Sequence, residues 1–230
     1  MKEEQTLPNV LVIIPAYNEA ERLGPVAEAA GSLLPVLVVD DGSGDETAEI
    51  GRQAGAQVLE QTPNQGKGAA LRAGFRCALA RGYEAVITLD ADGQHDPAEI
   101  PAFLQVFQES GADLVIGRRD FSRMPFIRRL SNTVGTRLFS RALGQTVPDN
   151  QSGYRLISRR LMEASLNCAE RGFAFEVEMI VECVRNHFQL AWVPIRTIYA
   201  GEGSHISPLK HAAEFVRVSY RTRRSLRRAD

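Results

Sequence analysis

Cysteine is scarce in this 230-residue chain, and the cysteines that occur do not form a set. Cys77, Cys168 and Cys183 are odd in number and have none of the paired spacings of a zinc site or a disulfide framework. We therefore expect free thiols and a reducing environment, which favours a cytoplasmic location.

Long apolar runs are missing as well. The longest, Val10–Tyr17, is far shorter than the roughly 20 residues that a helix needs to cross a bilayer. Residues 1–8 are acidic and lack the basic start and apolar stretch of a secretion signal. We expect neither a transmembrane segment nor a signal peptide.

The chain as a whole has no excess of either charge, because its net charge is only −1. We therefore expect no nucleic-acid partner. Residues 210–230 differ, since seven basic and two acidic side chains give them a local charge of +5. There Phe215 and Val218 alternate with arginines, which is typical of a basic helix lying on an anionic membrane, although a solvated helix end has the same pattern. We divide the chain into a domain, 1–207, and a basic helical tail, 208–230.

The rest of the composition is that of a globular protein, with 44% apolar residues. Short β-branched runs alternate with helical patterns, which indicates a single α/β domain with a mostly parallel central sheet flanked by helices. The expected strands are Val10–Ile14, Val36–Val39, Gln57–Glu60, Ala85–Leu89, Asp113–Ile116 and Leu190–Tyr199. The expected helices are Glu19–Leu34, one from about Asp45, Gly66–Arg81, one after Pro97, Ile127–Leu143, Ser158–Ala169 and Glu176–Phe188.

Polar residues follow each of the first five expected strands. They are Pro15–Glu19, Asp40–Ser43, Asn64–Lys67, Asp90–Asp92 and Gly117–Arg119. Ligands of open α/β sheets bind beyond the carboxyl ends of the strands. The repetition therefore predicts a binding site for a nucleotide and its phosphates along one edge of the sheet.

The acidic pair Asp90 and Asp92 directly follows the apolar run AVITL. Two carboxylates one residue apart can approach a divalent cation together, and hard oxygen ligands favour Mg²⁺ or Mn²⁺. Gln94 or Asp96 would add another oxygen. The alternative is a simple turn, since Asp92-Gly93 is also a turn signal.

Two other strand ends carry weaker signals. Asp40 and Asp41 precede a helix that Ser43 or Asp45 would cap, while an exposed carboxylate there would accept hydrogen bonds from a base or a ribose. In the loop Asn64–Gly68, glycines permit close backbone approach and Lys67 favours an anion near a helix start.

Five arginines crowd the stretch after the fifth expected strand, namely Arg118, Arg119, Arg123, Arg128 and Arg129. A solvated basic face is the default interpretation of such a run. Guanidinium groups also match phosphate geometry, so we expect one or two of the five to contact phosphate.

Taken in order, the segments VIIPAYNEAERL, VVDDGS, NQGKGAALRAGF, TLDADGQHDP and VIGRR resemble family 2 glycosyltransferases of the GT-A fold. MPFIRRLSN, DNQSGYR, FAFEVEMI and VPIRTIYAGEGSHI resemble the branch with dolichyl-phosphate mannose synthases and bacterial polyprenyl-phosphate glycosyltransferases. The resemblance covers roughly residues 9–207. Ser152 and Tyr154 replace the more usual Cys and Phe, which we expect to affect packing only.

The resemblance implies a set of site residues. Those that it implies at the nucleotide sugar are Pro15, Tyr17, Glu19, Asp40, Asp41, Lys67, Asp90 and Ala91. Those implied for the metal and the diphosphate are Asp90, Asp92 and Gln94. Those implied near the reaction centre are Asp92, Arg118, Arg129 and Asp149, with Arg118, Arg129 and His205 at the acceptor phosphate. His205 stands where many relatives have a lysine, which puts its role in doubt.

The implied reaction moves a hexosyl group, with inversion, from a UDP- or GDP-sugar to a polyprenyl phosphate, with Mg²⁺ or Mn²⁺. Asp149 either orients an arginine or, for a hydroxyl acceptor, acts as a base. A saccharide or other hydroxyl acceptor is one alternative, and a non-catalytic nucleotide-sugar-binding module is another. A nucleotidyltransferase is disfavoured, because PAYNEAER lacks the glycine-rich signature expected after the first strand.

Overall fold

The structure is a computed structural model that describes residues 8–121, 126–172 and 174–196, without the side chains of 126–132. Its strands are β1 (Val10–Ala16), β2 (Val36–Asp40), β3 (Gln57–Glu60), β4 (Ala85–Thr88), β5 (Leu114–Arg119), β6 (Arg155–Ser158) and β7 (Leu190–Ile195). Its helices are α1 (Ala20–Gly31), α2 (Thr47–Gln53), α3 (Lys67–Ala80), a 3₁₀ turn (Pro97–Glu99), α4 (Ile100–Ser110), α5 (Phe126–Leu143), α6 (Arg159–Ser165) and α7 (Ala174–Arg185).

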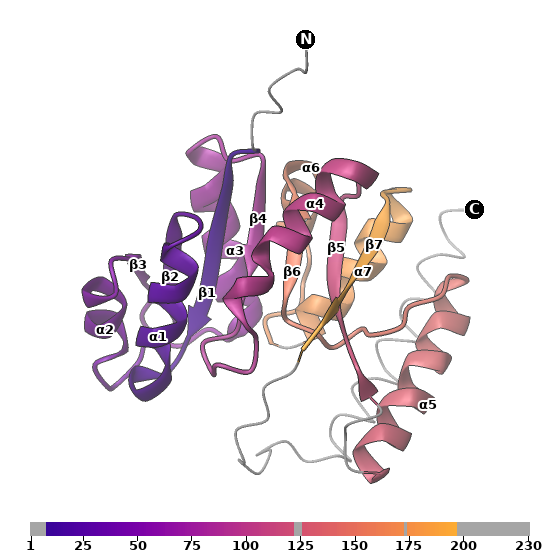
Figure 1. The fold of residues 1–230 in the computed structure, drawn as a ribbon, viewed down its shortest axis with the longest axis horizontal. Coiled ribbons are helices and arrows are strands. Elements are labelled where there is room, and N and C mark those ends of the chain that lie inside the picture. Colours follow the sequence, from indigo (N-terminus) through magenta and orange to yellow (C-terminus); the bar gives the residue numbers. More distant parts are fainter. Residues whose placement is uncertain (1–7, 122–125, 173, 197–230) are drawn as a thin grey trace.

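The described strands form one sheet in the order β3-β2-β1-β4-β6-β5-β7 (Figure 1). All neighbouring pairs are parallel except those of β6, which runs antiparallel to both β4 and β5. Because β4 and β5 both oppose β6, they run the same way as the rest of the sheet. Their carboxyl ends therefore meet at one edge, as the mostly parallel sheet expected from the sequence requires.

Apolar side chains on the two faces of the sheet form two separate cores. In β1, Leu11 and Ile13 belong to one cluster, while Val12 and Ile14 belong to the other. This follows from the geometry of a strand, whose successive side chains point to opposite faces. The expected layered α/β domain is thus built from strands that are buried on both faces.

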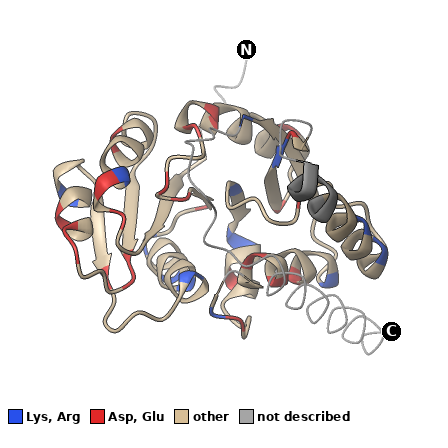
Figure 2. Ribbon diagram, turned by 90° about the horizontal axis from the view of Figure 1, so that it is seen from below, with Lys and Arg blue, Asp and Glu red and all other residues tan. Residues whose placement is uncertain are grey.

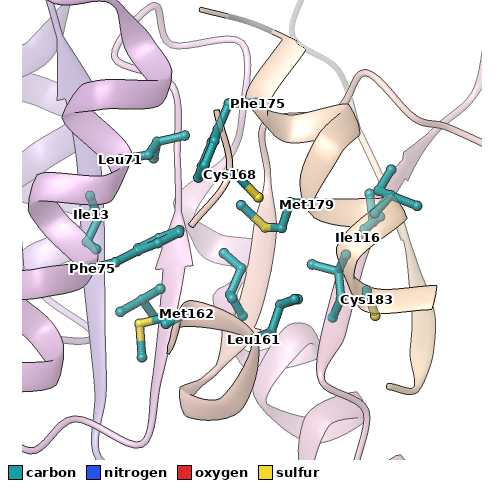
Figure 3. Close-up of a cluster of buried hydrophobic side chains, with 14 of the residues drawn as sticks. Ile13, Leu71, Phe75, Ile116, Leu161, Met162, Cys168, Phe175, Met179 and Cys183 are labelled. Atoms are coloured by element: carbon teal, nitrogen blue, oxygen red, sulfur yellow. The ribbon is translucent and has the colours of Figure 1, made fainter. Parts of the chain in front are cut away.

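Helices α3, α5, α6 and α7 cover the first face, and α1, α2 and α4 cover the second. Figure 3 shows Phe75 between Met162 and Phe175 in the cluster on the first face. Phe75 and Phe175 bring α3 and α7 together, with ring centroids 6.1 Å apart. This packing places the start of α3 beside the start of α7, which matters for the site.

The strand β6 was missed by the sequence analysis, which expected no strand between Ile116 and Leu190 and a helix from Ser158. Its four residues are too few to show a period, and it begins with a charged residue. Arg155 is fully buried, and its hydrogen bonds explain how a charge is tolerated there. Its guanidinium donates to the backbone carbonyls of Asn150, Ser152 and Glu176.

The helix expected after Asp45 begins at Thr47. The backbone N–H of Thr47 donates to Asp45 Oδ1 over 3.1 Å. The last expected strand ends at Ile195 within the described residues, and both His205 and the tail 208–230 lie outside them.

The three cysteines are free, in agreement with their spacing. Burial raises the pKa of Cys168 and of Cys183 to about 12, so both are unreactive packing residues. Among the described helices, none combines the length and the apolar character needed to cross a membrane.

Candidate active site at the carboxyl edge of the sheet

The carboxylate of Asp90 lies just beyond β4 and shares a lysine with a second acid. Lys67, the first residue of α3, places its Nζ 2.5 Å from Asp90 Oδ1 and 3.1 Å from Glu176 Oε1 of α7. Figure 2 looks at the molecule from the end where the parallel strands finish and shows acidic and basic segments on neighbouring elements there. Elements far apart in sequence thus meet at the edge that the sequence predicted.

The three side chains of this cluster differ in exposure. Glu176 is 6% exposed, Lys67 14% and Asp90 28%. Burial by itself raises the pKa of Asp90, but the Lys67 ammonium, together with His95 and Arg119, outweighs burial and lowers the pKa to about 2. Burial lowers the pKa of Lys67, but Asp90 and Glu176 outweigh it and raise that pKa. The carboxylate of Asp90 is therefore ionised and faces solvent only in part.

Gly153 leaves the space that the Asp90 carboxylate occupies. A Cβ on Gly153 would stand 2.5 Å from Asp90 Oδ2, so no other residue fits there without displacing the acid. Thr88, the last residue of β4, donates its hydroxyl to the Gly153 carbonyl over 2.7 Å. The loop before β6 is thereby held against the end of β4.

His95 lies on the same side of Asp90 as Gly153, near the same carboxylate oxygen. It is 5% exposed, and its Nδ1 lies 3.9 Å from Asp90 Oδ2. The ring packs on Tyr154, which stacks on Phe103 with centroids 4.3 Å apart. Burial lowers the pKa of His95, so the imidazole is neutral at pH 7. Tyr154 also donates to the Asp96 carbonyl over 3.2 Å, so the tyrosine does more than fill space.

Asp92 and Gln94 follow Asp90 in the same turn. Asp92 Oδ1 accepts the Gln94 N–H over 2.9 Å, so the turn expected from Asp92-Gly93 is present. The Gln94 side chain is exposed. The turn interpretation and the proposed metal role are compatible, because Asp92 keeps acceptor capacity on both oxygens.

The start of α3 differs from the expectation that its glycines admit a phosphate. The N–H groups of Gly68 and Ala69 both donate to the Arg171 carbonyl, over 2.7 and 3.2 Å. A Cβ on Gly66 would stand 2.7 Å from the same oxygen. The glycines thus permit close approach of the chain itself, and Lys67 is the part of this loop that faces the acids.

Asp40 and Asp41 are both buried, contrary to the expectation of an exposed carboxylate after β2. Asp41 accepts the backbone N–H groups of Gln65 and Gly66 over 2.9 and 2.6 Å. Asp40 accepts the Ser43 N–H and hydroxyl. These bonds order the loops around the edge, and the contact of either acid with a nucleotide stays a prediction.

The loop after β1 joins the loop after β2. Pro15 is partly buried in the strand, and Tyr17 is 49% exposed at the edge. Asn18 accepts from Gly44 N over 2.8 Å, and Glu19 pairs with Arg22 over 3.1 Å. Tyr17 is therefore available to a planar ligand.

Asp149 is fully buried and holds Arg119 of β5. Its Oδ2 lies 2.7 Å from Arg119 Nε, and its Oδ1 lies 3.0 Å from a terminal nitrogen of the same guanidinium. Oδ1 also accepts the Gln151 N–H over 3.1 Å. Both oxygens are thus occupied, and the geometry agrees with an Asp149 that orients an arginine. That arginine is Arg119, which the sequence analysis named on the predicted edge and among five crowded arginines but not in its set of implied site residues.

Arg118 is exposed and directly precedes Arg119 in β5. Because successive side chains of a strand alternate, Arg118 points to the face of the sheet opposite to Arg119. Arg129 lies in α5, but its side chain is outside the described part of the structure, as is His205. The roles expected for these three residues stay predictions.

A groove of about 780 Å³ begins next to the Arg119–Asp149 pair. Its lining includes Phe121 and Pro148, which flank the pair in sequence, and residues of α5 from Thr133 to Arg141. The Arg119 guanidinium lies 5.8 Å from the centre of the Phe121 ring. Arg119 thus lies against Phe121 of the groove lining, and its charge also helps to lower the pKa of Asp90.

Comparison with known proteins assigns this arrangement to a family. Residues 11–166 match the glycosyl transferase family 2 profile. The chain belongs to this family. The enzyme therefore is a glycosyltransferase, and the resemblance that its ordered motifs indicated is confirmed.

Individual relatives refine the comparison. A polyprenol monophosphomannose synthase of Mycolicibacterium smegmatis is 36% identical over 203 residues, which cover 80% of this chain and 76% of that protein. An undecaprenyl-phosphate mannosyltransferase of Micrococcus luteus is 35% identical over 201 residues, with 81% and 82% covered. A dolichyl-phosphate hexose transferase of Haloferax volcanii is 32% identical over 198 residues, with 84% of each covered.

The fold has solved counterparts. Glucosyl-3-phosphoglycerate synthase of Mycobacterium tuberculosis, crystallised with Mn²⁺, UDP and glucosyl-3-phosphoglycerate, superposes with a TM-score of 0.71 at 20% identity. The match covers 95% of this chain and 80% of that one. At this identity the likeness concerns the fold, and it confirms the expected GT-A type.

The residues of the transferase fit a divalent cation in part. In the described portion of the chain, no group of three or more His, Cys, Asp or Glu side chains is arranged to hold a metal by itself. Asp90 and Asp92 provide two carboxylates in one turn, which suits an Mg²⁺ or Mn²⁺ ion that takes its other ligands from water and a diphosphate. The donor set fits a metal that arrives with its substrate.

The site contains residues that the sequence analysis overlooked. Arg119 was one of five crowded arginines, and only strand alternation separates it from Arg118. His95 lies in the same motif as Asp90, and a sequence signal for it existed there. Gly153 and Glu176 also lie in quoted segments, DNQSGYR and FAFEVEMI, but no local pattern indicates that they contact Asp90 and Lys67, because those contacts join residues distant in the chain.

The substitution Gly153→Ala tests whether Gly153 controls the position of the Asp90 carboxylate. The added methyl must displace the carboxylate, so we expect the affinity for Mn²⁺ with UDP or GDP to fall about tenfold, or by about 1.4 kcal/mol. Calorimetric titration measures it. Gly172→Ala is the matched control, since its Cβ would meet no atom within 4 Å. If both variants bound the ion as tightly as the parent enzyme, Gly153 would not control the position of the Asp90 carboxylate.

Proposed function

We propose that this enzyme transfers a hexosyl group, with inversion at the anomeric carbon, from a UDP- or GDP-sugar to a polyprenyl phosphate in a reaction that requires Mg²⁺ or Mn²⁺. The observation that carries the proposal is the acidic edge around Asp90 together with an arginine held by a buried carboxylate, in a chain at least 32% identical to three transferases named for polyprenyl-type lipid phosphates.

The donor is proposed to lie along the edge formed by β1, β2 and β4. Tyr17 is exposed there and offers a stacking face for the base, while Asp40 and Asp41 order the loops beneath it. Asp90 and Asp92 hold the cation, which would neutralise the departing diphosphate. Lys67 adds a positive charge beside the same diphosphate.

The acceptor is proposed to approach from the groove next to Arg119. A guanidinium held by a buried carboxylate is pre-oriented, so it loses little freedom when it binds a phosphate. A phosphate monoester has a second pKa of about 6 and is mostly dianionic at neutral pH, so it attacks without a base. Arg118, Arg129 and His205 remain proposed contacts of the acceptor phosphate.

The direct test is a panel of UDP- and GDP-sugars with a short polyprenyl phosphate and Mn²⁺ or Mg²⁺, analysed for glycolipid by mass spectrometry. We expect one donor to react, chelation to stop transfer, and Asp92→Ala to lower the rate at least about a hundredfold, since it removes a cation ligand. Transfer to saccharides but not to the lipid phosphate would contradict the proposed acceptor. Donor binding without any transfer would favour a binding module.

Asp149→Asn separates the two roles of this residue. If Asp149 orients Arg119, we expect turnover to fall only about tenfold, because the amide keeps part of the hydrogen bonding, and Arg119→Gln to cost about a hundredfold. Steady-state turnover at saturating donor measures both. Arg185→Gln, an exposed arginine at the end of α7, is the control. A loss above about a thousandfold in Asp149→Asn alone would instead support a base.

We also propose that the basic tail, residues 208–230, contacts anionic membrane surfaces. Its local charge of +5 provides the attraction, and each basic side chain near such a surface contributes about 1 kcal/mol. We expect the full chain, but not one ending at residue 207, to float with vesicles containing phosphatidylglycerol. Flotation of both chains, or of neither, would exclude the tail as the contact.

A further inference from the structure

Lys67 occupies one of the two carboxylate oxygens that Asp90 offers to a cation. Its Nζ lies 2.5 Å from Asp90 Oδ1, and it is the only lysine among the residues that the structure describes. The second acid, Glu176, is 3.1 Å from the same nitrogen and almost fully buried. An ammonium group and a divalent cation therefore compete for Asp90, and the structure provides a second acid for the lysine.

The distance between Lys67 and Glu176 is set by rigid backbone. A Cβ on Gly68 would stand 2.6 Å from Phe175 Cβ, so the starts of α3 and α7 are in direct contact. Arg155 donates to the Glu176 carbonyl and fixes the first turn of α7 from below. Glu176 thus remains within reach of Lys67 whatever Asp90 binds.

Asp90, by contrast, has little freedom to move away. Gly153 lies against its Oδ2 and His95 lies on the same side. The flexible member of the trio is the lysine, whose ammonium ends a chain of four methylene groups. When a cation binds, the movement must come from Lys67.

The second acid changes the energetics of that movement. A buried ammonium that loses its partner is strongly unfavourable. With Glu176 at 3.1 Å, Lys67 gives up one carboxylate and keeps the other. Before a cation binds, the same lysine prevents Asp90 and Glu176 from facing each other as like charges.

We propose that Glu176 is a positioning residue that retains Lys67 when Asp90 exchanges the lysine for a divalent cation. The inference rests on the proposed cation at Asp90. It gives Glu176 a role in the metal-dependent reaction although the residue touches neither cation nor sugar. Lys67 stays charged, buried and beside the diphosphate, instead of turning out to solvent.

The exchange is observable at the lysine itself. The chain has three lysines, so a ¹⁵N-lysine spectrum is simple, and Lys67→Arg identifies the signal of Lys67. We expect saturating Mg²⁺ to shift this signal in the parent enzyme without loss. In Glu176→Gln we expect Mg²⁺ to broaden it beyond detection, because the released ammonium then exchanges its protons with water. Glu163→Gln, an exposed acid of α6, is the control.

Cation affinity provides the second measurement. Without nucleotide, we expect Glu176→Gln to bind Mn²⁺ about tenfold more weakly than the parent, or by about 1.4 kcal/mol, and Lys67→Met to bind it more tightly, since the competitor is gone. Electron paramagnetic resonance of free Mn²⁺ measures both, and thermal melting confirms that the variants fold.

The outcomes separate the two claims. The role of Glu176 is overturned if Mg²⁺ leaves the Lys67 signal unchanged. It is also overturned if the signal responds to Mg²⁺ in the same way in Glu176→Gln and in the parent. Either result counts even if the parent binds Mn²⁺ and Asp90→Asn abolishes that binding. Weaker Mn²⁺ binding by Lys67→Met also overturns it. If the parent binds no Mn²⁺ with or without UDP or GDP, the proposed metal-dependent function fails together with the inference.

Discussion

The mutual neutralisation of buried charges at one edge of the sheet is the constraint on which the rest of this structure depends. Three acids and three bases take part, namely Asp90, Asp149, Glu176, Lys67, Arg119 and Arg155. Burial of an unpaired charge is so costly that each group must find its partner before the core can close. Because the two sets are equal in number, these six side chains carry no net charge among themselves.

This requirement explains why distant segments are tied so tightly. Lys67 lies at the start of α3, Glu176 at the start of α7, and Arg155 in the short strand β6. Close glycine contacts bring the two helix starts together, and the carbonyls around Arg155 attach the loop before β6 to α7. The stability of the core and the geometry of the site thus rest on the same contacts, and a change in one is expected to alter the other.

The same arrangement suits a transfer between two anions. Asp90 and Asp92 offer carboxylates on one side, and Arg119, held by Asp149, offers a guanidinium on the other. The diphosphate leaving group would arrive with a cation, so it needs carboxylates that bind that cation. The phosphate acceptor would arrive without one, so it needs a positively charged side chain. Members of glycosyl transferase family 2 share the fold, and this separation of charge within it is what the proposed reaction uses.

The sequence by itself determined the α/β class, six of the seven strands, the family, and the edge at which the site lies, because strand periodicity and the residues that follow each strand are local properties. The tertiary structure alone decided which residues meet there. It paired Arg119 with Asp149, revealed β6 through the burial of its first residue, and brought Glu176 to Lys67. Such contacts join segments about a hundred residues apart, and no local pattern records a partner that folding supplies.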